Sequence, residues 1–146
     1  MNNEQLTMNR RTINSSNPVY EKAYALAVRI VNAYRHLSDQ KREFVLSKQL
    51  LRSGTSIGAN LAEANGAISE ADLSAKVSIS YKETQETKYW LSLLKDTGYI
   101  DQKSFDSIYA EVDEVAAILF AILKKTKRIK TMNSEQTVYI RLVVNC

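Results

Sequence analysis

The chain has 146 residues, which suits one domain and leaves little room for a second. It is 45% hydrophobic and 25% charged, a composition that excludes a disordered chain. Because the sequence has no run of about 18 apolar residues, no transmembrane helix is predicted. A lone cysteine, Cys146, excludes an internal disulfide framework and fits the cytoplasm, while the net charge of +4 permits a polyanionic partner and equally fits an ordinary basic domain.

The first helix is predicted from about Pro18 to Leu37. Residues 1–17 are polar, lack the apolar core of a signal peptide, and are expected to form a flexible arm. Asn17 and Pro18 are typical of a helix start, with asparagine as the cap and proline at the first helical position. Apolar residues then recur every three or four positions, as in an amphipathic helix, until Ser38 and Asp39, which we expect to cap a second helix.

A second helix is predicted from about Gln40 to Asn65, and three of the chain's four glycines lie within it or just after it. A phosphate-binding loop is the alternative. However, Gly54 and Gly58 are four residues apart, no lysine follows them, and the preceding residues have a helical pattern. Gly66 stands where a helix end often needs a left-handed residue.

Small residues on the second helix indicate close packing. In a helix, Gly54, Gly58 and Ala62 share one face, and each glycine costs about 1 kcal/mol relative to alanine. Close backbone approach explains that cost, either within the bundle or between subunits. Trp90, on the third helix, is a further candidate for close helix packing.

Two more helices complete an all-α prediction. Ser69 resembles the start of a capping box, and the third helix runs from there to Gly98. The fourth follows Asp101 and keeps its apolar spacing to about Ile129. Residues 18–131 therefore predict an antiparallel up-down four-helix bundle. The tail, residues 132–146, is rich in β-branched residues; an added strand, a docked segment and a disordered segment all stay open.

We expect a polar face on the second helix to meet a polar stretch on the third. We expect Arg52 to pair with Glu83 or Glu86. Such a network must be fully paired if it is buried, and simple solvation of both faces is the alternative. The residues of this predicted network are Arg52, Ser56, Asn60, Glu63, Glu83 and Glu86.

Catalytic signals are weak. His36 is the chain's one histidine, so a histidine-based metal site or a Ser-His pair cannot form within one chain. Ser92 and Lys95 match a Ser-Lys spacing without any supporting motif. A carboxylate site built from Glu63, Glu83 and Glu86 is the remaining enzymatic alternative. We therefore expect no enzyme, no cofactor and no metal.

Basic residues gather at the end of the fourth helix, in the segment KKTKRIK. Lysines at a helix C-terminus also complement the helix dipole, so an ordinary structural role is the alternative to nucleic-acid binding. If these residues bind phosphates, affinity should depend steeply on salt. The candidate nucleic-acid-binding residues are Lys124, Lys125, Lys127, Arg128 and Lys130.

From about Tyr20 to about Lys127, the chain resembles the four-helix-bundle proteins encoded in intervening sequences of bacterial 23S ribosomal RNA genes. The motifs that carry this resemblance are Arg52-Ser53, Ser56-Ile57, Asn60-Leu61-Ala62-Glu63, Glu86, Tyr89-Trp90-Leu91, Leu94 and Thr97-Gly98-Tyr99-Ile100. The resemblance implies a cytosolic up-down bundle that assembles into a ring-like homopentamer and has no established enzymatic activity. It also implies kinship with the accessory variability protein of diversity-generating retroelements, a basic barrel that works with a reverse transcriptase and its RNA.

Two functions are therefore expected. The first is a non-enzymatic homo-oligomer that binds structured RNA or DNA through a basic surface. The alternative is a scaffold that docks a partner protein, such as an enzyme that acts on nucleic acids.

Overall fold

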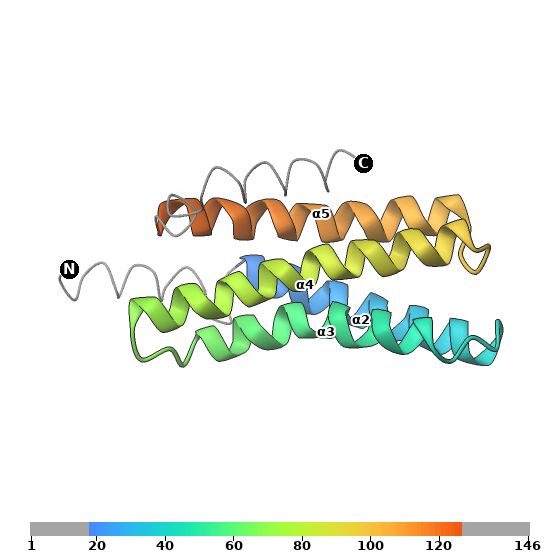
Figure 1. Ribbon diagram of the computed structural model, residues 1–146, viewed down its shortest axis with the longest axis horizontal. Helices are drawn as coiled ribbons and strands as arrows, with labels where there is room; N and C mark the ends of the chain where they lie inside the picture. Colours follow the sequence, from blue (N-terminus) through green and yellow to red (C-terminus); the bar gives the residue numbers. More distant parts are fainter. Residues whose placement is uncertain (1–17, 127–146) are drawn as a thin grey trace, which may run out of the picture.

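The computed structural model describes residues 18–126, and in this part of the chain four antiparallel α-helices lie side by side, with no strand (Figure 1). They are α2 (Pro18–Asp39), α3 (Leu46–Ala64), α4 (Glu70–Asp96) and α5 (Gln102–Lys125). The predicted all-α four-helix bundle is confirmed. None of these four helices combines the length and the apolar character needed to cross a bilayer. The predicted arm (1–17), the end of the predicted bundle (127–131) and the tail (132–146) lie outside the described residues.

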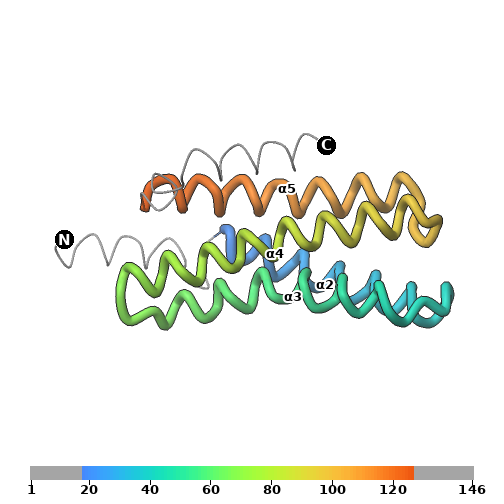
Figure 2. Tube along the Cα trace, viewed as in Figure 1, coloured from blue at the N-terminus to red at the C-terminus, as the bar shows by residue number. Residues whose placement is uncertain are grey.

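The helices follow one another around the bundle in chain order, as the trace in Figure 2 shows. α2 packs on α3, α3 on α4 and α4 on α5, while α5 closes the bundle through a less extensive contact with α2. α2 and α4 are therefore diagonal partners whose outer surfaces face opposite ways. This is the up-down topology that short connections produce.

The core is one continuous cluster to which all four helices contribute. The apolar stripe predicted for the first helix is buried on α2, and the buried members are Val19, Ala23, Leu26, Ile30 and Leu37. Against this stripe pack the largest buried side chains of the other helices, such as Leu50, Leu91 and Leu119. Burial of apolar area in this cluster is the main stabilising contribution to the fold.

Buried hydroxyl groups lie where α3 and α4 approach each other. Ser80 Oγ on α4 donates to the backbone oxygen of Ile57 on α3 at 2.8 Å, and Thr87 Oγ1 donates to Ser53 Oγ at 3.1 Å. All four residues are fully buried. The small side chains of Ser53, Ser80 and Thr87 allow a close approach, and the hydrogen bonds between the helices satisfy groups that would otherwise be costly to bury.

The α2–α3 connection differs from the prediction. Ser38 and Asp39 belong to α2 and do not cap α3, and residues 40–45 are not helical. Within this connection, Arg42 takes the left-handed conformation with φ +54°. The carboxylate of Glu43 accepts from the backbone N–H groups of Val45, Leu46 and Ser47 at 3.1, 2.9 and 2.6 Å. Glu43 thus supplies the cap that sequence placed at Ser38-Asp39.

The remaining boundaries follow the predicted signals, apart from one glycine. Ser69 Oγ accepts from Asp72 N–H at 3.0 Å, and Asp101 Oδ1 accepts from Ser104 N–H at 2.7 Å. Gly98 ends α4 with φ +83° and is the one glycine of residues 18–126 with a positive φ. Gly66 is not left-handed, so that expectation is wrong.

The two glycines inside α3 pack against α2 within the same bundle. A Cβ built at Gly54 would lie 2.8 Å from two side-chain carbons of the buried Ile30, so alanine there would displace a core residue. A Cβ at Gly58 would lie 3.7 Å from the backbone of Ala23, an ordinary contact that leaves room for a methyl group. Ala62 is exposed. Residues four apart in a helix are offset by about 40° around its axis, so Gly54, Gly58 and Ala62 turn progressively away from α2. The prediction of one shared packing face is therefore wrong at Ala62.

Candidate functional site

A charged cluster joins the middle of α3 to α4. Arg52 Nη1 lies 3.5 Å from Glu83 Oε1, and Arg52 Nη2 donates to Glu86 Oε2. Trp90, partly buried against the core, donates from Nε1 to the other oxygen of Glu86 at 3.4 Å. Both predicted pairings of Arg52 are present. The Arg52 side chain is 50% exposed and that of Glu83 is 17% exposed, so the cluster lies at the edge of the core rather than inside it.

The two glutamates differ in their electrostatic surroundings. Burial raises the pKa of Glu83, and the neighbouring Glu86 raises it further against the attraction of Arg52. The hydrogen bond from Arg52 lowers the pKa of Glu86 and outweighs the opposing effect of burial. One guanidinium therefore stabilises the negative charge on Glu86 more than the charge on Glu83. The Glu83 Oε2 atom is buried without a hydrogen-bond partner among the described residues.

Glu63 is not part of this cluster. It accepts from Lys76 Nζ at 2.5 Å, nearer the other end of α3 and α4. Ser56 Oγ donates to the backbone oxygen of Arg52 at 2.6 Å, and Asn60 Nδ2 donates to that of Ser56 at 2.8 Å. The predicted six-residue network is therefore wrong as a single unit.

The predicted carboxylate site does not form either, because Glu63 lies apart from Glu83 and Glu86. Glu63 is eleven residues from Arg52 along α3, about 16 Å along the helix axis. Within residues 18–126, no group of three His, Cys, Asp or Glu side chains is placed to hold a metal ion.

The signal that could have placed Glu63 is the antiparallel register. α3 and α4 run in opposite directions, so eleven residues forward from Arg52 on α3 corresponds to eleven back from Glu86 on α4. That step ends next to Lys76, which is the residue that pairs with Glu63.

Electric charge is distributed unevenly between the bundle and its flanking segments. Residues 18–126 contain 14 Lys and Arg and 14 Asp and Glu, whereas the whole chain contains 20 and 16. The net charge of +4 therefore comes entirely from residues 1–17 and 127–146. Many charges of the bundle are also paired locally, as in Lys22–Glu114 at 2.6 Å and Arg29–Glu111 at 2.5 Å between α2 and α5.

The predicted basic cluster lies at the junction of these two regions. Lys124 and Lys125 are exposed in the last turn of α5, and neither forms an ion pair within residues 18–126. Lys124 Nζ lies 5.8 Å from the centre of the Phe120 ring. Lys127, Arg128 and Lys130 lie outside the described residues.

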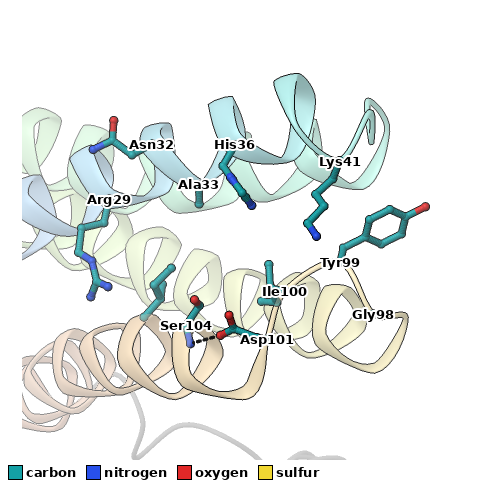
Figure 3. Close-up of a pocket in the computed structure, with 11 residues that line it drawn as sticks. Arg29, Asn32, Ala33, His36, Lys41, Gly98, Tyr99, Ile100, Asp101 and Ser104 are labelled. Carbon is teal, nitrogen blue, oxygen red and sulfur yellow. Dashed lines mark hydrogen bonds between the residues drawn. The ribbon is translucent and has the colours of Figure 1, made fainter.

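A cleft of about 700 Å³ opens between α2 and the α4–α5 connection (Figure 3). Arg29 and His36 line it from α2, Lys41 from the α2–α3 connection, and Asp101 from the start of α5. Ala33 on α2, Ile100 in the α4–α5 connection and Ile108 on α5 supply apolar walls. The sequence prediction missed this cleft, because no local pattern indicates that residues 29–41 lie beside residues 98–108.

Comparison with known proteins identifies the family. Residues 15–121 match the sequence profile of the 23S rRNA-intervening sequence proteins. The chain belongs to this family. The intervening-sequence protein described here is also 49% identical to a protein of unknown function from the S23 ribosomal protein family of Bacteroides thetaiotaomicron. That crystal structure matches with a TM-score of 0.72 over 73% of this chain and 98% of the other. No curated protein matches the chain.

The family match divides the candidate sites of this intervening-sequence protein into two groups. The Arg52 cluster and every residue that lines the cleft lie within residues 15–121. The basic cluster from Lys124 to Lys130 follows the matched region. The first two therefore lie within the matched region, while the basic cluster lies beyond it.

Proposed function

We propose that this intervening-sequence protein is a non-enzymatic, cytoplasmic homo-oligomer that binds structured RNA or DNA through phosphate contacts. The observation that carries the proposal is the charge distribution: a neutral bundle whose flanking segments hold the entire net charge of +4. Five of the basic residues fall within seven positions, from Lys124 to Lys130. Clustered cations are the usual electrostatic footprint of a phosphate-binding surface.

Two exposed apolar surfaces support self-association. On α2, Tyr24 is 62% exposed and Val28, one turn later, is 47% exposed; on α4, Tyr89 is 59% exposed. Because α2 and α4 are diagonal in the bundle, these surfaces lie on different sides of it. Two different surfaces that can contact each other are what a head-to-tail ring requires. We propose five copies, the number implied by the resemblance to the family, so that the basic cluster repeats around the ring.

Nucleic-acid binding is tested by gel-shift titration of duplex RNA and DNA at several salt concentrations. We expect the K127A/R128A/K130A variant to flatten the slope of log affinity against log salt by about 2 to 3. The matched control, K48A/K82A/K103A, removes three exposed lysines of the bundle and should keep most of the slope. Absence of binding by the unmodified protein at low salt would refute the proposal, and so would equal effects of the two triple variants.

Assembly is tested by mass measurement in solution. A pentamer has five times the 16.5 kDa mass of the chain. We expect Tyr24→Lys and Tyr89→Lys each to break the ring, because each places a charge in one half of the same repeating contact. Ile68, which is 87% exposed in the α3–α4 connection, offers the control Ile68→Lys, which should leave the mass unchanged. A monomer in the unmodified protein would contradict the proposed assembly.

A scaffold that docks a partner protein is the second candidate. The α2–α3 connection exposes Phe44 by 46% and Val45 by 70%, with the Arg42 guanidinium 5.3 Å from the Phe44 ring centre. An aromatic side chain beside an arginine is a common anchor at protein interfaces. This function predicts that a partner captured from nuclease-treated lysate is lost with F44S/V45S and kept with K127A/R128A/K130A. The reverse pattern would support the nucleic-acid function instead.

A further inference from the structure

The cleft between α2 and the α4–α5 connection has the dimensions of a small-molecule site. Its volume of about 700 Å³ lies within the range of pockets that enclose most of a metabolite. Three segments that are far apart in sequence form its walls: α2, the α2–α3 connection, and the α4–α5 connection with the first turns of α5. The cleft lies at the seam where α5 closes on α2, the less extensive of the helix contacts.

The walls combine an apolar surface with hydrogen-bond donors, two of which, Arg29 and Lys41, are cationic. Ala33 and Ile108 provide apolar area, while Arg29, His36 and Lys41 extend toward the cleft from the α2 side, as Figure 3 shows. Arg29 is held in place by Glu111 Oε1 at 2.5 Å and by Ser107 Oγ at 3.0 Å. A guanidinium fixed in this way is preorganised for a further anionic partner.

Lys41 and His36 retain donor capacity. Neither forms a hydrogen bond through its side chain or an ion pair with the other described residues. The carboxylate that lines the cleft is that of Asp101, whose pKa is lowered first by hydrogen bonds from Ser104 and then, more weakly, by Lys103 and Lys41. One oxygen of Asp101 is already used to cap α5 at Ser104 N–H. The cleft therefore has more cationic than anionic groups.

We propose that this cleft binds the phosphate monoester of a nucleotide-sized organic group. The phosphate lies toward His36 and Lys41, and the nearby carboxylate of Asp101 weakens its binding. Two donors on one side suit a phosphate with several acceptor oxygens. The organic part packs on Ile100 and Ile108.

The ligand has two possible sources, a free mononucleotide or the 5′-phosphorylated end of a nucleic-acid strand, and both present the same chemistry. The cleft residues lie between 29 and 108, whereas the proposed nucleic-acid function depends on the cluster from Lys124 to Lys130. The two proposals therefore fail independently: K127A/R128A/K130A should leave mononucleotide binding by the cleft unchanged.

Isothermal titration of the full chain with adenosine monophosphate tests the cleft, and we expect Lys41→Gln and His36→Gln each to weaken binding about tenfold. Asp101→Asn should tighten binding a few fold, because asparagine caps a helix as well as aspartate does but does not repel the phosphate. Lys82→Gln, at an exposed α4 lysine outside the cleft, is the matched control and should change nothing.

Binding of the isotope-labelled chain is also followed by NMR, which needs no variant. Adenosine monophosphate should shift the amide signals of residues 29–41 and 98–108. No shift up to about 5 mM, or shifts elsewhere only, would overturn the proposal, as would equal weakening by Lys41→Gln and Lys82→Gln. A 5′-phosphorylated oligonucleotide that binds more tightly than its 5′-hydroxyl form and than the mononucleotide identifies a strand end as the ligand. Equal or weaker binding identifies the free mononucleotide.

Discussion

Two connections lie together at one end of the bundle and perform the same task with different chemistry. Between α4 and α5, Gly98 takes φ +83°, Tyr99 N–H donates to Leu94 O at 2.8 Å, and Asp101 caps the next helix. Between α2 and α3, the left-handed residue is Arg42 and the capping group is the carboxylate of Glu43. The first connection uses the residue types that these positions favour, and the second uses neither.

The difference shows what makes a boundary readable in sequence. Glycine and aspartate have strong local preferences at a helix end, so the sequence predicts the roles of Gly98 and Asp101 correctly. Glutamate has no such preference at a helix start, and arginine rarely adopts a positive φ. Glu43 caps α3 because its long side chain reaches three N–H groups from two positions before Val45, and it is only 8% exposed. The tertiary arrangement that holds this loop makes the unusual cap possible.

The largest expected effect in this comparison is that of Glu43→Ala. The variant leaves three N–H groups of the first turn of α3 without their acceptor, and we expect a loss of about 2 kcal/mol in the free energy of unfolding. Urea denaturation followed by circular dichroism measures it. Glu43→Gln keeps one acceptor oxygen and should lose about half as much. If Glu43→Ala loses less unfolding free energy than Glu43→Gln, solvent replaces the carboxylate as acceptor and the cap does not stabilise α3.

Acid should weaken the same cap. Burial raises the pKa of Glu43, but the hydrogen bonds from Leu46, Ser47 and Val45 outweigh it, and the net effect lowers the pKa below the ordinary 4.5. A group with a lowered folded-state pKa stabilises fully above its unfolded pKa, and this stabilisation is lost as the pH falls through the folded value. The stability gap between the natural protein and Glu43→Ala should therefore narrow below about pH 4. If the difference in unfolding free energy between the two proteins stays constant from about pH 6 to about pH 3, the ionised Glu43 carboxylate is not what stabilises the cap.

Gly98→Ala should have a smaller effect, a loss of about 1 kcal/mol. No atom lies within 4 Å of the Cβ that alanine would add, so the cost arises from the backbone conformation at φ +83° alone. Gly66→Ala is the matched control, because Gly66 has no positive φ and its added Cβ would make only an ordinary contact with Glu63 O at 3.6 Å. Thermal unfolding of the two variants compares them, and equal losses would refute the conformational explanation.

The smallest effect, and one of opposite sign, is expected for Arg42→Gly. Glycine relieves the left-handed strain at φ +54° but adds freedom to the unfolded chain, for a net gain of about 0.5 kcal/mol. Arg42→Ala removes the guanidinium from the Phe44 ring and keeps the strain, so it should give no gain. If Arg42→Gly destabilises the protein, the Arg42 side chain contributes more to this connection than its conformation costs.

The prediction of the polar cluster divides in a similar way. Arg52, Glu83 and Glu86 were recognised because one arginine faced two glutamates spaced three residues apart, a single helical turn. Glu63 was grouped with them because it shares a helical face with Arg52, but that face runs the whole length of α3. A shared helical face says which way two side chains point, but it does not say which residue of the next helix each one meets. The packing of α3 against α4 decides that, and it places Lys76 beside Glu63.

The local sequence is enough to predict the helical class, the buried stripe of α2, the caps at Ser69 and Asp101, and the end of α4 at Gly98. Each of these depends on hydrogen bonds and side-chain spacing within a few residues, which the local chain contains in full. The tertiary structure alone decided that Gly54 requires a missing side chain while Gly58 admits a methyl group, that Glu63 pairs with Lys76, and that Lys41 lies beside Asp101 around a cleft. These outcomes depend on which surfaces meet when separate helices pack, and that choice is made by the core as a whole.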